Sequence, residues 1–126
     1  MKINYFQKKQ FCLILFFITL FPSVSFSQNL IWAKAMGDYG QESGIGMAVD
    51  PQGNMYSTGY FQYSFDFDPG AGVTTLTTDG VSDCYINKMD PSGNLLWVKR
   101  IGGPSEDRPT GLTLDKFGNV YTIGTF

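Results

Sequence analysis

Three observations in the sequence predict an all-β fold for residues 28–126. The stretch repeats itself at a spacing of 65 residues, a short turn motif occurs three times, and the runs beside each turn are rich in Val, Ile, Tyr, Trp and Thr. Residues of these types favour strands. No stretch of residues 28–126 shows the apolar period that indicates an amphipathic helix.

The repeat is visible without any gap. Residues 29–61 overlay residues 94–126, and 12 of the 33 overlaid positions are identical. Trp32 meets Trp97, and Tyr56 meets Tyr121. A repeat of this kind indicates a fold built from copies of one supersecondary unit. Because the two tryptophans are equivalent in the repeat, we predict that both serve packing rather than ligand binding.

The turn motif is Asp-x-x-Gly-Asn, and each copy lies between two strand-like runs. An aspartate at the first corner can accept hydrogen bonds from backbone amides, and the glycine supplies a left-handed residue without steric cost. The pattern is typical of a type I turn closed by a glycine bulge. We therefore interpret the three aspartates as turn formers, with a calcium-binding or catalytic role as the alternative. They are Asp50, Asp90 and Asp115.

The runs beside the turns are the predicted strands. They cover residues 45–49, 55–60, 84–89, 95–101, 112–114 and 120–125. Four strands in 65 residues, arranged as two hairpins, are the pattern of a β-propeller blade. Within the first blade the predicted order runs from residues 45–49 on the inside to residues 95–101 on the outside.

The repeat also has a phase. Residues 30–36 are equivalent to the outermost strand, so we predict a strand there that is placed to close a ring. A ring needs 4 to 8 blades, whereas one and a half are present. We therefore expect either a piece of a longer protein or a short chain that assembles into a ring.

Four stretches of the chain resemble the SBBP family, which are bacterial β-propeller repeats frequent in secreted proteins of Bacteroidetes. The stretches are residues 46–61, 65–69, 83–90 and 96–103, and the resemblance as a whole extends from residue 29 to residue 126. It implies blades of four antiparallel strands. It implies no activity, because the family has no shared catalytic or ligand-binding motif to transfer.

The first 27 residues are typical of a signal peptide. Three lysines precede an apolar run at residues 11–21, and Ser25 and Ser27 fit the small residues before a cleavage point at Gln28. The alternative is a membrane anchor, but the run is shorter than the roughly 20 residues a spanning helix needs. We expect a secreted or cell-surface protein with no membrane span after cleavage, and a β-propeller repeat region over residues 28–126.

The composition of residues 28–126 excludes several functions. Six basic and 11 acidic residues give a net charge of −5, without the basic cluster that nucleic-acid binding needs. Cys84 is the one cysteine of this stretch, so an internal disulfide is excluded. We predict that Cys84 is a small buried residue, with a reactive thiol as the alternative. The sequence has no histidine, the usual general base and commonest metal ligand.

Two groups of acidic residues remain as candidates for chemistry. In the connection over residues 61–82, Phe65 and Phe67 alternate with Asp66 and Asp68. We expect the phenylalanines to face inward and the aspartates to be solvated, and the alternative is a site for a hard cation.

The second group lies in the loops between blades. It consists of Asp38, Glu42, Glu106 and Asp107. Paired carboxylates can hydrolyse glycosides, but acids in two successive equivalent loops favour repeated surface chemistry. We assign no catalytic, cofactor-binding or metal-binding residue, and we expect no enzymatic activity and no cofactor.

The sequence as a whole favours an exported β-propeller scaffold that serves as a binding or interaction module. Its expected partner is an extracellular ligand, either a glycan or a protein, and its expected neighbours are further blades of a longer chain or other copies of itself. Two alternatives stay open. One is a part of a propeller enzyme that acts on extracellular polysaccharide, and the other is the noncatalytic repeat stalk of a surface adhesin.

Overall fold

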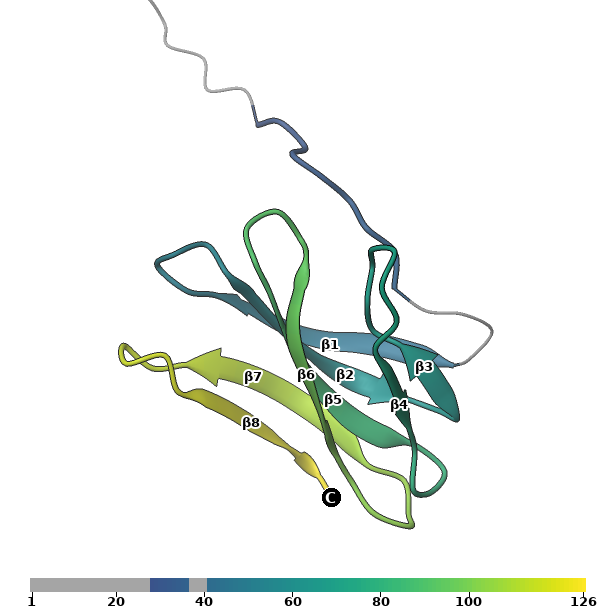
Figure 1. Cartoon of the computed structure of the whole chain (residues 1–126). Coiled ribbons are helices and arrows are strands. Elements are labelled where there is room, and N and C mark those ends of the chain that lie inside the picture. Colours follow the sequence, from purple (N-terminus) through teal and green to yellow (C-terminus); the bar gives the residue numbers. More distant parts are fainter. Residues whose placement is uncertain (1–27, 37–40) are drawn as a thin grey trace, which may run out of the picture. The chain divides into compact units, whose positions relative to one another are not determined.

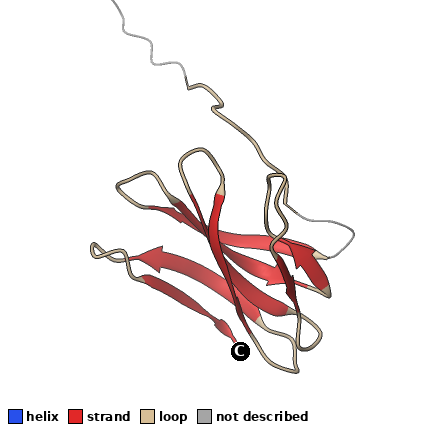
Figure 2. Cartoon of the chain, viewed as in Figure 1, coloured by secondary structure: helices blue, strands red, loops and turns tan. Residues whose placement is uncertain are grey.

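The computed structural model describes residues 28–36 and 41–126. The predicted signal peptide at residues 1–27 and the candidate Asp38 lie outside the described residues. The chain divides into two units, residues 1–30 and residues 31–126. The second unit holds eight strands, and the described residues contain no helix (Figures 1 and 2). The all-β prediction is confirmed.

Four of the strands form one antiparallel sheet. They are β1 (Glu42–Val49), β2 (Met55–Phe61), β5 (Asp83–Met89) and β6 (Leu95–Ile101), in the order β1-β2-β5-β6. This is the strand order predicted for a blade. The strand β1 begins three residues earlier than predicted, and a register shift between Gly44 and Gly46 interrupts its pairing with β2.

The last two strands form a separate hairpin. They are β7 (Arg108–Leu114) and β8 (Val120–Thr125), and β7 packs against β1 and β2 (Figure 1). The approach is close at Gly46, where a Cβ atom would lie 3.4 Å from the backbone nitrogen of Leu112. The hairpin repeats β1 and β2 in sequence and stacks on the sheet as the inner half of a second blade.

The connection between β2 and β5 forms a small hairpin of its own, made of β3 (Ser64–Asp66) and β4 (Thr75–Thr77). Phe65 and Phe67 are buried and pack with Phe61 and Tyr85 in the main aromatic cluster. The ring centres of Phe65 and Phe67 are 4.6 Å apart, and Phe67 and Tyr85 are 4.9 Å apart. The inward orientation of the two phenylalanines is confirmed.

The three Asp-x-x-Gly-Asn motifs are hairpin turns, as predicted. In each one the aspartate Oδ1 accepts hydrogen bonds from the backbone amides two and four residues later, and Oδ2 accepts one from the asparagine amide. The glycines adopt the left-handed conformation, with φ of 84° at Gly53, 76° at Gly93 and 84° at Gly118.

The prediction of a strand at residues 30–36 is wrong. These residues form no ladder, whereas their repeat equivalent β6 pairs along its length with β5. Side chains attach the segment to the turn between β5 and β6 instead. The indole nitrogen of Trp32 donates to the carbonyl of Pro91 at 3.0 Å, and the Lys34 ammonium donates to the carbonyl of Gly93 at 3.0 Å. A strand requires a paired neighbour, and no described strand pairs with this segment.

Candidate interaction surfaces

The four-stranded sheet has two faces with different side chains. Along β2, Tyr56 and Thr58 point to one face, while Ser57 points to the other, since successive strand residues alternate. The hairpin β7–β8 lies on the first face, and we call this the covered face. The other face carries the β3–β4 hairpin and residue Met36, and we call it the methionine face.

Equivalent side chains of the two repeats differ in their exposure to solvent. Tyr56 and Thr58 on the covered face are 4% and 0% exposed. Their equivalents in β8, Tyr121 and Ile123, are 55% and 70% exposed. Tyr56 packs against Trp97 and Lys88 of the neighbouring strands, and β7 approaches Gly46, which pairs with Thr58. Tyr121 and Ile123 have no such neighbours among the described residues, since β8 is the last described strand. The outer side of β7–β8 therefore carries apolar side chains at the positions equivalent to the covered face, but no described strand packs against it.

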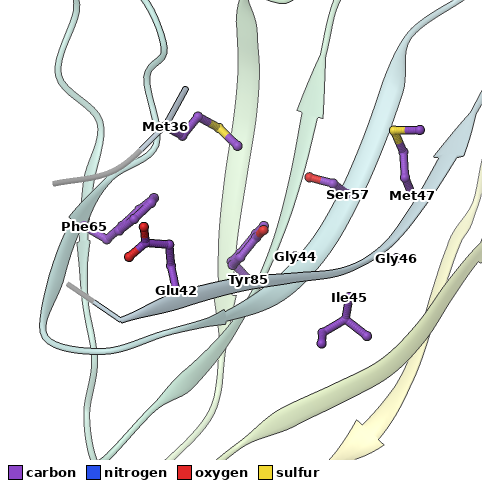
Figure 3. A pocket seen from close by; sticks show the side chains of 9 residues that line it. All are labelled: Met36, Glu42, Gly44, Ile45, Gly46, Met47, Ser57, Phe65 and Tyr85. Carbon is purple, nitrogen blue, oxygen red and sulfur yellow. The ribbon is translucent and has the colours of Figure 1, made fainter. Parts of the chain in front are cut away.

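The methionine face carries a complementary apolar patch. Four methionines line a pocket of about 140 Å³ together with Trp32 and Asn87. They are Met36, Met47, Met55 and Met89, which are all the methionines of residues 28–126. A neighbouring hollow of about 530 Å³ extends this patch along β1, between Met47 and the side chains of Phe65 and Tyr85 (Figure 3).

The equivalent residues of the second repeat indicate that the methionine positions serve stacking between blades. Met47 and Met55 correspond to Leu112 and Val120, which are half-buried where β7–β8 approaches the sheet. In the first repeat Met47 stays 66% exposed and Val49 stays 56% exposed. The methionine face and the outer side of β7–β8 thus present the two halves of the contact that already joins β7–β8 to the covered face.

A third surface lies at the turns. The β1–β2 turn and the β7–β8 turn flank a groove of about 390 Å³, formed by residues 49–52 and 114–118. Gln52, Lys116 and Phe117 are exposed there, and the Lys116 ammonium lies 5.0 Å from the ring centre of Phe117. The Phe117 side chain is 79% exposed.

The carboxylates beside this groove are already engaged. The side-chain amide of Asn119 chiefly holds the pKa of Asp115 below its ordinary value, and the backbone amides of Asn119 and Phe117 add to this effect. Asp50, the other carboxylate of this groove, accepts hydrogen bonds from the backbone amides of Gln52 and Asn54 and from the Asn54 side chain. These aspartates hold the turns, so Gln52, Lys116 and Phe117 are the side chains left to meet a ligand.

Other residues singled out in the sequence serve packing or local structure. Cys84 is buried, as predicted, and burial above all raises the pKa of its thiol to about 11, with the charges of Asp107 and Asp83 contributing. Trp97 packs edge-on against Tyr56 with ring centres 6.0 Å apart.

The aspartates of the β3–β4 hairpin are half-buried rather than fully solvated. Asp66 Oδ1 accepts hydrogen bonds from the backbone amides of Asp68 and Thr74, and these bonds lower the pKa of Asp66. Asp68 Oδ1 accepts one from Gly70. Their oxygens therefore order the hairpin.

The acids between blades divide into two kinds. Glu42 and Glu106 are exposed, and Glu106 pairs with Arg108, in agreement with surface chemistry. Asp107 is 2% exposed, so the prediction of a surface role is wrong for this residue. Its burial depends on the loop before β5, since its backbone nitrogen donates to the carbonyl of Ser82 at 2.9 Å. Sequence reasoning missed the pairing of these two loops.

Two features are absent from residues 28–36 and 41–126. No helix in this part of the chain is long and apolar enough to cross a bilayer. No three Asp, Glu, Cys or His side chains in the same part of the chain come together as metal ligands would.

Comparison with known proteins supports the repeat. Residues 96–125 match the model of the SBBP family, described as a β-propeller repeat. The matched stretch covers β6, β7 and β8, and it corresponds at the 65-residue spacing to residues 31–60. No solved structure matches the chain.

Two curated proteins are similar in sequence. An uncharacterized WD repeat-containing protein of Acanthamoeba polyphaga mimivirus is 24% identical over 117 residues, which covers 82% of this chain and 8% of that protein. The regulatory protein FlaEY of Caulobacter vibrioides is 24% identical over 96 residues, covering 76% of this chain and 10% of that protein. The chain thus spans a tenth or less of these relatives. The matches and the fold together support a β-propeller repeat protein.

Proposed function

We propose that this chain is an exported β-propeller scaffold without catalytic activity of its own, which presents the turns on one rim to an extracellular glycan or protein. The observation that carries the proposal is the groove between the β1–β2 and β7–β8 turns. There, two equivalent turns from successive repeats hold an exposed phenylalanine, a lysine and a glutamine around one hollow.

The chemistry of the groove suits a carbohydrate. An exposed aromatic ring offers a flat apolar surface, and an amide and an ammonium beside it offer donors and an acceptor to hydroxyl groups. Small-molecule sites commonly combine apolar contact with a few placed polar groups. The turns are held by their aspartates on a stacked β framework, which is the arrangement that lets loops carry recognition.

The comparisons support an interaction role in general terms. One relative is named for WD repeats and the other is named a regulatory protein. The stacking of β7–β8 on β1 and β2 supports a framework that further blades extend, from a longer chain or from another copy.

The test begins with protein recovered from the medium of an expressing bacterium, where we expect the N-terminus at Gln28. Binding to an array of purified polysaccharides and to candidate surface proteins is then measured. We expect one class of glycan to bind and the variant Phe117→Ser to bind it at least tenfold more weakly, which corresponds to about 1.4 kcal/mol. The matched control is Val73→Ser, because Val73 is 78% exposed but lies outside the groove.

Absence of binding to every glycan and protein would overturn the ligand proposal. If Phe117→Ser and the unaltered chain bind equally well, the groove does not take part in ligand binding. Release of shorter sugars from a bound polysaccharide would favour the enzyme alternative instead.

A further inference from the structure

Two loops meet at the end of the sheet opposite the Asp-x-x-Gly-Asn turns. Residues 78–82 lead into β5, and residues 102–107 connect β6 to β7. Backbone hydrogen bonds join them, from Asp107 to Ser82 at 2.9 Å and from Val81 to Ser105 at 3.3 Å. This junction is the point where the chain passes from the first blade to the second.

Two carboxylates are buried at this junction. Asp83 is 0% exposed and Asp107 is 2% exposed. Asp83 Oδ2 accepts hydrogen bonds from Arg100 Nη1 at 2.7 Å and from the backbone nitrogen of Asp79 at 3.0 Å. Asp107 Oδ2 accepts one from the backbone nitrogen of Gly103 at 2.8 Å. Among the described residues, Arg100 is the one cation bonded to this pair.

One oxygen of each aspartate points to a shared space beside Gly102. Asp83 Oδ1 is buried and has no hydrogen-bond partner, and the same is true of the Ser82 hydroxyl. Asp83 Oδ1 and Asp107 Oδ2 each lie 2.7 Å from the point that a Cβ atom on Gly102 would occupy. The two carboxylates thus converge on one spot that the glycine leaves free of any side chain.

The charge at this spot is negative. Two carboxylates face one guanidinium, and the Arg100 side chain is itself one-third exposed to water. A buried carboxylate oxygen without a partner is rare in folded proteins and calls for a water, a proton or an ion.

We propose that Asp83 and Asp107 bind a hard divalent cation, calcium, beside Gly102. Calcium takes carboxylate, hydroxyl, backbone carbonyl and water oxygens in flexible numbers. The two aspartates supply the charged ligands, and calcium can complete its coordination with water. Bound there, the ion joins the loop before β5 to the loop before β7 and fixes the connection between successive blades.

The test uses the exported chain after treatment with a chelator. We expect added CaCl2 to raise the thermal unfolding midpoint by several degrees and to give a saturable heat in titration calorimetry. The variants Asp83→Asn and Asp107→Asn keep the side-chain shape and should lose both responses. The control Asp68→Asn removes a carboxylate from the β3–β4 hairpin and should respond as the unaltered chain does.

A second variant keeps the test valid if one variant does not fold. Calcium binding by Asp107→Asn can be measured by calorimetry even if Asp83→Asn fails to fold. No heat and no change of midpoint in the unaltered chain would overturn the proposal and leave water in the space. Loss of the response in Asp68→Asn together with its retention in Asp107→Asn would place the ion on the β3–β4 hairpin and would overturn it as well.

Discussion

Single residues determine the turns of this protein. Asp50, Asp90 and Asp115 make the same hydrogen bonds at three places, so their role follows from local sequence alone. The same local chemistry identifies the glycine in each turn, because only the left-handed conformation brings the chain back into the second strand. Features of this kind could be predicted in full.

Gly118 offers a clean test of that conformational requirement. Its φ is 84°, and a Cβ atom there would meet nothing within 4 Å, so the change Gly118→Ala adds strain without a clash. We expect a loss of roughly 1–2 kcal/mol in the free energy of unfolding. Denaturant unfolding measures it.

The matched control is Gly103→Ala, where a Cβ atom also meets nothing within 4 Å but no left-handed backbone is present. Equal stability of the two variants would show that the turn does not require its glycine conformation.

Burial of Asp107 shows where residue-level prediction ends. Its sequence neighbours, Glu106 and Arg108, are exposed and paired with each other, so the local pattern indicates a surface loop. The residue is buried because a loop some 25 positions earlier packs over it. Contacts of this length leave no periodic signal in the sequence, so the acidic junction could not have been found from sequence.

At the scale of the elements, pairing decides which runs become strands. Residues 30–36 and β6 share Leu, Trp and Lys at equivalent positions, yet the second is a strand and the first is not. The strand β6 has β5 beside it, whereas residues 30–36 are held by Trp32 and Lys34 at a turn. The repeat in the sequence shows that residues 30–36 and β6 are equivalent, but it does not show whether a strand lies beside each of them.

The β3–β4 hairpin depends on its phenylalanines. Phe67 is fully buried and contacts the rings of Phe61, Phe65 and Tyr85. We expect Phe67→Ala to cost about 3–5 kcal/mol in the free energy of unfolding. The loss should appear first as faster hydrogen exchange at the backbone amides of Phe67 and Thr78, which bond across this hairpin.

The control for this prediction is Val73→Ala, since Val73 lies in the same connection but is mostly exposed. Unchanged exchange and stability in Phe67→Ala would mean that the hairpin is held by its backbone pairing alone.

At the largest scale, β7–β8 stacks on the four-stranded sheet, and two apolar surfaces stay exposed among the described residues of the unit 31–126. Tyr56 and Thr58 are buried in the first repeat, whereas their equivalents in β8, Tyr121 and Ile123, are exposed. Open sheet faces with apolar residues favour association, and repeat units bury their faces on neighbours. Blade class and strand order were predictable from the repeat, whereas the two open faces emerged only from comparing burial at equivalent positions.

If the outer side of β7–β8 and the methionine face are the two halves of one stacking contact, the average mass of the exported chain should depend on its concentration, which light scattering measures. In the absence of further blades, the outer side of β7–β8 should bind the methionine face of another copy. We expect the average mass to rise with concentration and to remain that of one chain in the variant Ile123→Lys, while the control Phe117→Ser behaves as the unaltered chain. A single-chain mass at every concentration, with sharp cooperative unfolding, would show that these two surfaces do not stack on each other.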